Sequence, residues 1–133
     1  MSTFVDTSAF VALLNADDSF HEAAVATWER LADAEEPLVT SSYVVVETNA
    51  LVQRRLGMDA LRAFSDDVVR AVQVAWVGRE VHEAATSAQM LAGRRHLSLV
   101  DCASFLVMRH LGLTEVFAFD DHFRDQGFRV IRR

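Results

Sequence analysis

Hydrophobic and polar positions follow two different periods along the chain. Short runs of β-branched and aromatic residues are separated by longer stretches in which apolar residues recur at helical spacing. This alternation is typical of a parallel sheet covered by helices. The short runs predict five strands, at residues 3–5, 38–40, 73–77, 116–119 and 128–131. The periodic stretches predict helices at residues 8–15, 19–33, 43–56, 58–71, 80–92, 99–111 and, in a shorter form, 121–126.

One segment fits either kind of element. Three consecutive valines at 44–46 favour a strand, but the pattern continues through Glu47, Asn49 and Leu51 as a helix. We therefore predict an α/β fold, a three-layer α/β/α sandwich with a mainly parallel five-stranded sheet, in which residues 1–133 form a single domain. Ligands bind beyond the carboxyl ends of the strands in such folds, so acids at those ends are the first candidates for a site.

Acidic residues directly follow two of the predicted strands. Asp6 ends the first strand and opens a helix. Asp120 stands in the same relation to the fourth strand, with Asp121 as the alternative to it. A carboxylate in this position also caps a helix by accepting amide hydrogen bonds, and the two roles are compatible.

Glu47 is the most informative acid on a predicted helix. Its neighbours three and four residues away are all apolar: Tyr43, Val44, Ala50 and Leu51. A glutamate centred on an apolar stripe is desolvated, which costs several kcal/mol unless a cation or hydrogen bonds compensate it. The alternative is a tilted helix that lets Glu47 reach water.

Asp101 is predicted to be the third residue of a helix that Ser98 caps. The simplest interpretation is a relative of the capping box, in which Asp101 is also favoured by the helix dipole. However, Leu97 and Ser104 share its face, so Asp101 points toward a small and half-apolar surface. That surface is compatible with a buried site.

These acids become informative when they are taken together. Clustered carboxylates repel one another, and they coexist where a hard divalent cation neutralises them. Mg²⁺ or Mn²⁺ held by carboxylates and water is the site that phosphoryl chemistry uses. The pattern therefore predicts a divalent metal centre.

The composition removes several other functions. There are 13 basic residues against 19 acidic ones, a net charge of −6, and every basic residue is arginine. Without lysine, the chain has neither a P-loop phosphate-binding lysine nor a Schiff-base lysine, and it is not a protein kinase or a phospho-receiver domain. The single cysteine, Cys102, excludes an internal disulfide and a multi-cysteine zinc site.

Four segments carry a resemblance to a known family. FVDTSAF, VVVETNAL, LSLVDCASF and VFAFDDHF resemble, in order and approximate spacing, the PIN-domain family, specifically the VapC-like toxin ribonucleases of bacterial toxin–antitoxin pairs. By that resemblance, the acidic quartet that binds Mg²⁺ or Mn²⁺ consists of Asp6, Glu47, Asp101 and Asp120. Ser8 matches a hydroxyl that supports the first aspartate, whereas Ala118 replaces the Thr or Ser that many relatives have, which puts the support of Asp120 in doubt.

The resemblance also implies an activity and partners. It implies a metal-dependent endoribonuclease that hydrolyses RNA phosphodiesters, a homodimer, and a cognate antitoxin protein whose carboxyl-terminal segment covers the site. Two other functions remain open: a Mg²⁺-dependent phosphatase with Asp6 as covalent nucleophile, and a noncatalytic α/β interaction module. The phosphatase is disfavoured because Ser8 stands where a second aspartate is usual.

Other polar residues give weaker signals. The five histidines show no pair at metal-ligand helical spacing, so solvated or capping roles are expected, although His122 adjoins the acids. The arginine pairs at 54–55, 94–95 and 132–133, together with Arg124, are candidates for RNA phosphate contacts, but isolated arginine pairs are usually solvated. The start of the chain has no basic leader and no apolar run of membrane-spanning length, so we expect a cytoplasmic protein without a membrane partner.

Overall fold

The structure is a computed structural model, and it describes residues 1–132. Its centre is a five-stranded sheet in the order β3-β2-β1-β4-β5, in which every neighbouring pair is parallel. The strands are β1 (Thr3–Val5), β2 (Leu38–Ser41), β3 (Gln73–Ala75), β4 (Glu115–Phe117) and β5 (Arg129–Ile131). The predicted α/β class and parallel sheet are thus confirmed.

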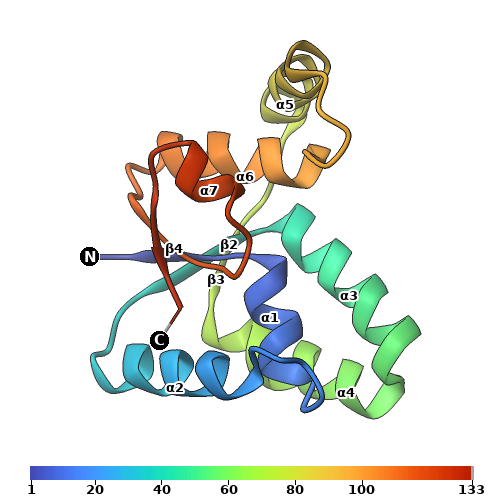
Figure 1. Cartoon of the computed structure of the whole chain (residues 1–133), viewed down its shortest axis with the longest axis vertical. Helices are drawn as coiled ribbons and strands as arrows, with labels where there is room; N and C mark the ends of the chain where they lie inside the picture. The colour runs from blue at the N-terminus through green and yellow to red at the C-terminus, as the bar shows by residue number, and fades with distance from the viewer. Residues whose placement is uncertain (133) are drawn as a thin grey trace.

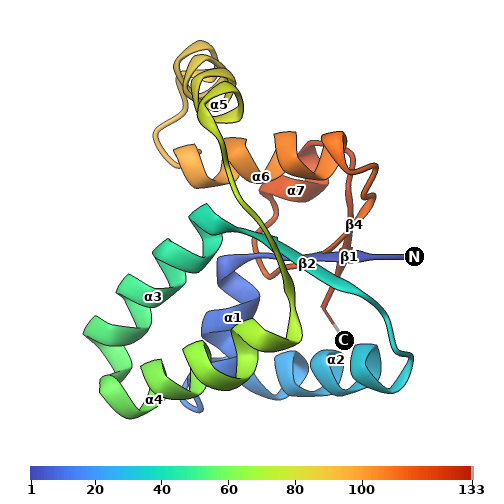
Figure 2. The same ribbon diagram turned by 180° about the vertical axis from the view of Figure 1, so that it is seen from behind.

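Helices cover both faces of this sheet. They are α1 (Thr7–Leu14), α2 (His21–Asp33), α3 (Ser42–Leu56), α4 (Met58–Ala63), α5 (Arg79–Ala92), α6 (Leu99–His110) and α7 (His122–Asp125). In Figures 1 and 2, α6 and α7 lie on one side of the sheet, and α1, α2 and α4 lie on the other. Helix α3 packs against both α1 and α6, while α5 packs on α6 and projects away from the sheet. Within the described residues, no helix combines the length and hydropathy that a membrane crossing requires.

Phenylalanines fill the core on both sides of β1. Phe4 and Phe105 both contact Phe123 on the α6–α7 side, with ring centroids 6.4 and 5.1 Å from it. On the other side, Phe10 and Phe64 meet edge to face at 5.4 Å. Each fully buried ring contributes about 1.5–3 kcal/mol through removal of apolar surface from water. This packing holds the two helical layers against the central strands.

Local interactions fix the ends of two helices, and a side-chain hydrogen bond joins two strands. The Ser41 hydroxyl accepts the amide hydrogen bond of Val44 (3.2 Å) and caps α3, which settles the valine-rich segment as helix. Helix α5 ends at Gly93, whose φ of 59° lies in the left-handed region that glycine adopts without a Cβ penalty. In the sheet, the Thr40 hydroxyl of β2 donates to the buried carbonyl of Val5 (2.7 Å) and ties β2 to β1.

Most predicted elements shift by one or two residues at an end in the structure, and two of the differences have an identifiable cause. Residues 58–71 were expected to form one helix, but α4 ends at Ala63, and a π turn (Phe64–Val68) and a 3₁₀ turn (Val69–Ala71) follow. The wider turn begins at Phe64, whose ring packs into the core. The predicted strand 116–119 ends at Phe117, because the Phe119 amide donates to the Ser8 hydroxyl (2.9 Å) instead of continuing the ladder.

Candidate active site

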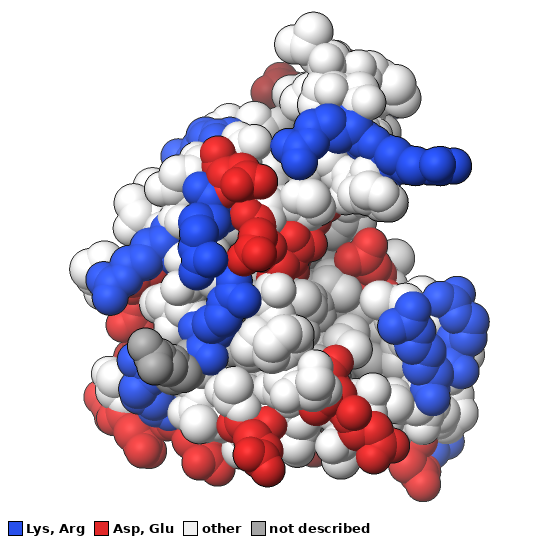
Figure 3. Space-filling view, viewed as in Figure 1, with Lys and Arg blue, Asp and Glu red and all other residues white. Residues whose placement is uncertain are grey.

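The four acids expected at the site line one cavity of about 710 Å³ at the carboxyl ends of β1 and β4. They reach it from four places: Asp6 after β1, Glu47 on α3, Asp101 on α6 and Asp120 between β4 and α7. The pairing of Val5 with Phe117 brings the ends of β1 and β4 together. In the space-filling view, acidic side chains gather in a hollow, and arginine side chains lie on both sides of it (Figure 3).

Asp6 lies deepest in this cavity and caps α1. Its Oδ2 accepts hydrogen bonds from the Ser8 amide (3.2 Å) and the Ser8 hydroxyl (2.7 Å), and the residue is 4% exposed. Burial raises the pKa of the Asp6 carboxyl from 3.8 to about 7. The two Ser8 hydrogen bonds oppose this rise, while the charges of Asp101 and Asp120 add to it. A cation in the cavity would favour the ionised carboxylate.

Ser8 connects the ends of the two central strands. Its hydroxyl donates to Asp6 and accepts the amide hydrogen bond of Phe119. It therefore fixes the Asp6 carboxylate relative to the chain that leads to Asp120. This geometry fits the supporting role that the family resemblance implied for Ser8.

Asp101 combines a capping role with a place in the cavity. The Ser98 hydroxyl accepts the Asp101 amide, and the Asp101 carboxylate accepts the Ser98 amide, both at 3.0 Å, which completes a capping box. Burial is the main cause that raises the pKa of Asp101, and the charge of Asp120 raises it further. The two interpretations of this residue are therefore compatible.

Asp120, and not Asp121, lies in the cluster with Asp101. One potential ligand atom each from Asp101, Asp120 and His122 lies within 4.8 Å of the other two. Asp121 also lines the cavity, but its side chain is 72% exposed and pairs with Arg132 (2.7 Å) and Arg124 (3.3 Å). The hydrogen bond from Arg132 is the largest cause that lowers the pKa of Asp121.

His122, noted from the sequence only as a neighbour of the acids, lies in this cluster. Its amide donates to Asp120 Oδ1 (2.9 Å), and its Nε2 lies 3.7 Å from the same oxygen. The amide hydrogen bond supports Asp120 where Ala118 offers no hydroxyl. A solvated or capping role was expected, and its position two residues after Asp120 was the available signal, because a short turn there brings both side chains to one place.

Glu47 lines the rim of the cavity. It is half-buried, and its neighbour Ala50 is exposed, so the desolvated surroundings expected from the apolar residues are not found. The reason is that α3 borders the cavity and its acidic side is left open. The prediction that Glu47 is desolvated is therefore wrong, although Glu47 does line the cavity.

The donor set fits a hard divalent cation. Carboxylate oxygens from separate elements are ligands that Mg²⁺ and Mn²⁺ accept, and the imidazole beside them suits Mn²⁺ better than Mg²⁺. Thr7 also lines the cavity, and among residues 1–132 its buried hydroxyl has no hydrogen-bond partner. Repulsion among the acids and this unpartnered hydroxyl both indicate a cavity suited to an ion with its water.

Comparisons with known proteins agree with this arrangement. Residues 3–129 match the PIN domain family. The chain is 36% identical over 130 residues to the 23S rRNA-specific endonuclease VapC20 of Mycobacterium tuberculosis, with 97% of each chain covered. The crystal structure of that protein, described as a sarcin-ricin loop cleaving toxin, has a TM-score of 0.85 and covers 99% of this chain and 100% of its own.

Two more distant structures share the fold. VapBC2 from Rickettsia felis, bound to a promoter DNA fragment, has a TM-score of 0.72 at 12% identity and covers 98% of this chain and 97% of its own. FitAcB from Neisseria gonorrhoeae has a TM-score of 0.68 at 15% identity and covers 97% of this chain and 96% of its own.

Proposed function

Since this chain belongs to the PIN-domain family, we propose that it is a metal-dependent endoribonuclease and the toxin of a toxin–antitoxin pair. The observation that supports this most directly is the convergence of Asp6, Glu47, Asp101 and Asp120 on one cavity. Similarity over nearly the whole length to an enzyme named for 23S rRNA cleavage makes ribosomal RNA the substrate class that we propose. With ribosomal RNA as the substrate, we propose that the protein acts in the cytoplasm.

Each residue of the site has a distinct task in this proposal. Asp6, Asp101 and Asp120, with Glu47 at the rim, would hold Mg²⁺ or Mn²⁺. The bound ion would supply an activated water and stabilise the charge that develops on the phosphate oxygens. Ser8 orients Asp6, the Ser98 amide orients Asp101, and the His122 amide orients Asp120.

Cleavage of RNA by the isolated protein tests this function. Purified chain without an antitoxin is incubated with ribosomes or total RNA, with Mg²⁺, with Mn²⁺ or with EDTA, and new RNA ends are mapped. We expect discrete ends that need the metal and disappear in Asp101→Asn. Cleavage that persists in EDTA, or in that variant, would refute the assignment.

We also propose that the protein forms a homodimer. Large apolar side chains are exposed on α3, on α5 and on the connection from β3 to α5, namely Val46, Met90, Leu91 and Trp76. The Tyr43 hydroxyl hydrogen-bonds to His82 and joins α3 to α5. Exposed apolar surface of this kind is typical of an interface, and a two-fold axis would bury it on both copies. Light scattering of wild type and Leu91→Glu tests this, with a monomeric wild type as the refuting result.

An antitoxin is the second partner that we propose. The cavity is acidic in a protein of net charge −6 and would bind an arginine side chain at the carboxylates that would hold the metal. Metal and antitoxin would then compete for the same carboxylates.

A further inference from the structure

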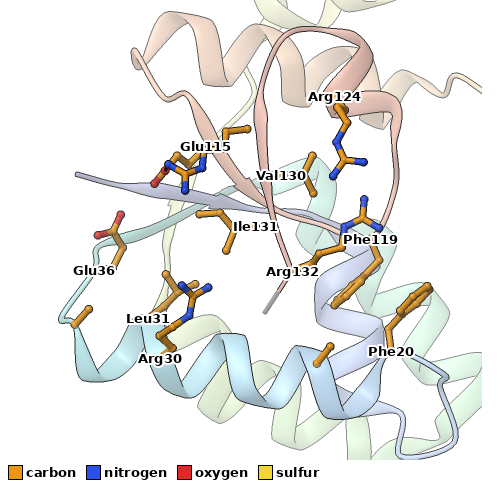
Figure 4. Close-up of a pocket in the computed structure, with 13 residues that line it drawn as sticks. Phe20, Arg30, Leu31, Glu36, Glu115, Phe119, Arg124, Val130, Ile131 and Arg132 are labelled. Carbon is orange, nitrogen blue, oxygen red and sulfur yellow. Dashed lines mark ion pairs between the residues drawn. The ribbon is translucent and has the colours of Figure 1, made fainter.

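A second cavity, of about 860 Å³, lies between α2 and β5 and has no part in the chemistry described above. We call it the arginine cavity, because Arg30, Arg124, Arg129 and Arg132 line it (Figure 4). It shares two residues with the acidic cavity, Phe20 and Phe119. Its volume is within the range of ligand-binding cavities. A ligand that fills both cavities therefore passes over these two rings.

The two shared phenylalanines form a flat stack at the junction. Their ring centroids are 4.7 Å apart with an interplanar angle of 15°, and Phe20 is 44% exposed. The Phe20 amide donates to Asp18 Oδ1 (2.8 Å), which fixes the turn that presents the ring. The Arg132 guanidinium lies 6.0 Å from the centroid of Phe119. Exposed aromatic rings with an adjacent arginine are the usual platform for an unpaired nucleic-acid base.

The arginines offer hydrogen-bond donors to anions. Arg124 and Arg132 converge on a single oxygen, Asp121 Oδ1, from two different elements. Arg132 Nε is buried and, among residues 1–132, has no hydrogen-bond partner. Arg30 forms no ion pair within the same described residues. The cavity therefore holds unused donors whose geometry suits an anionic oxygen.

The charge of the cavity is positive although the protein is acidic. Four arginines line it against two glutamates, Glu36 and Glu115. Glu115 pairs with Arg129 (3.3 Å), and Glu36 accepts the Thr3 hydroxyl (3.0 Å). Both side chains of the Arg124–Asp121 pair are largely exposed, as are Arg129 in its pair with Glu115 and Asp121 in its pair with Arg132. An exposed pair is weak enough for a phosphate to compete with the carboxylate.

We propose that the arginine cavity binds the single-stranded RNA that flanks the scissile phosphodiester. A base stacks on Phe20, and the adjoining phosphates lie against the arginines. The inference rests on the proposed ribonuclease function and deepens it by naming where the substrate is held. The stacked rings favour RNA over an acidic peptide, because a peptide needs no flat aromatic platform.

RNA binding without cleavage tests the aromatic platform. The full chain is titrated into a short labelled single-stranded RNA in EDTA, and fluorescence anisotropy gives Kd. Phe20→Ala is expected to weaken binding about 5- to 150-fold, the cost of losing one stacked base. Phe20→Trp is expected to preserve binding. Met58→Ala, on a side chain of similar exposure (47%) outside both cavities, is the matched control and is expected to bind as wild type does.

An abasic RNA separates stacking from a general loss of structure. Where the bases on one flank of the RNA are replaced by abasic residues, Phe20→Ala and wild type are expected to bind with equal Kd. Substituting the 5′ and the 3′ flank in turn shows which side lies over Phe20. A loss in Phe20→Ala that is the same for normal RNA and for both abasic RNAs would overturn the stacking role.

The salt dependence of binding tests the arginines. Arg30→Ala is expected to reduce the slope of log K against log salt by about 0.7, the value for one phosphate contact on a single strand. Arg62→Ala removes the same charge from α4, outside both cavities, and is expected to leave the slope unchanged.

The outcomes separate this proposal from the ribonuclease function. If wild type cleaves RNA with metal while Phe20→Ala and Arg30→Ala bind RNA as their controls do, the arginine cavity is not an RNA site and the enzyme assignment stands. If wild type neither binds nor cleaves RNA, both fail. If the two variants lose affinity for an antitoxin and keep their affinity for RNA, the cavity is a protein-binding site and this proposal is wrong.

Discussion

The buried carboxyl of Asp6 is expected to make the metal-free protein less stable as the pH rises. In the unfolded chain this group ionises near its ordinary pKa of 3.8, whereas in the folded protein its pKa is about 7. Between those values the folded state binds one proton more than the unfolded state, so the free energy of unfolding falls with increasing pH. The whole rise in pKa corresponds to about 4 kcal/mol. That is a large share of the roughly 5–15 kcal/mol that stabilises a typical domain.

Asp6→Asn removes the ionisation and keeps the shape. The amide oxygen of asparagine can accept the two hydrogen bonds from Ser8 that the carboxylate accepts now. Below about pH 3.8, where Asp6 of wild type is protonated in both the folded and the unfolded state, the variant is expected to be about as stable as wild type. Its advantage is expected to grow as the pH rises from 3.8 to about 7. At pH 8, without metal, it is expected to be more stable by up to about 4 kcal/mol, because wild type then carries a buried charge.

Urea unfolding followed by circular dichroism, in EDTA at several pH values from 5 to 8, measures this difference. Subtracting the variant from wild type isolates Asp6 from Asp101, whose pKa burial also raises. Asp17→Asn, which removes an exposed carboxylate, is expected to follow the pH dependence of wild type. Parallel curves for wild type and Asp6→Asn would refute the argument that burial controls this carboxyl.

Four other measurements address the metal and the partner. Mg²⁺ or Mn²⁺ at a hundredfold excess over Kd is expected to add about 2.7 kcal/mol to the free energy of unfolding of wild type and so to raise its melting temperature. The melting temperature of Asp6→Asn is expected to rise much less, and an equal rise in both proteins would show that Asp6 does not bind the metal. Asp120→Asn is expected to lose the stabilisation by metal, whereas Asp121→Asn is expected to keep it. Asp121→Asn is also expected to bind RNA more tightly, because Arg132 is released from its ion pair. If calorimetry shows that the metal stabilises Asp120→Asn and not Asp121→Asn, the two assignments are exchanged. His122→Ala is expected to lower the affinity for Mn²⁺ more than that for Mg²⁺, since imidazole is a poor ligand for magnesium, and equal changes in a calorimetric titration would show that His122 does not contact the ion. Glu47→Gln is expected to weaken antitoxin binding, and excess Mn²⁺ is expected to weaken it in wild type; unchanged antitoxin affinity in both cases would place the inhibitory contact away from the acidic cavity.

The sequence by itself determined the features that depend on neighbouring residues. The alternation of short apolar runs with helical stretches predicted the parallel sheet and its covering helices. It did so because the spacing of apolar residues in each element shows which face is buried. Asp6 and Asp101 were identifiable for a similar reason, since capping acts over two or three residues. The family motifs then suggested which acids belong together.

Tertiary structure alone decided the features that depend on distant segments. Strand β4 ends before Phe119 because the Phe119 amide donates to the Ser8 hydroxyl and not to a neighbouring strand. Ser8 and Phe119 are 111 residues apart in sequence. The half-buried state of Glu47 follows from where α3 lies at the rim of the cavity, which its apolar neighbours do not encode. The arginine cavity forms only where α2 meets β5, elements from opposite ends of the chain, so Phe20 and Arg132 show no pattern that relates them in sequence. Hydrogen bonds and periodicity within one turn are local properties, whereas a cavity depends on the packing of separate elements.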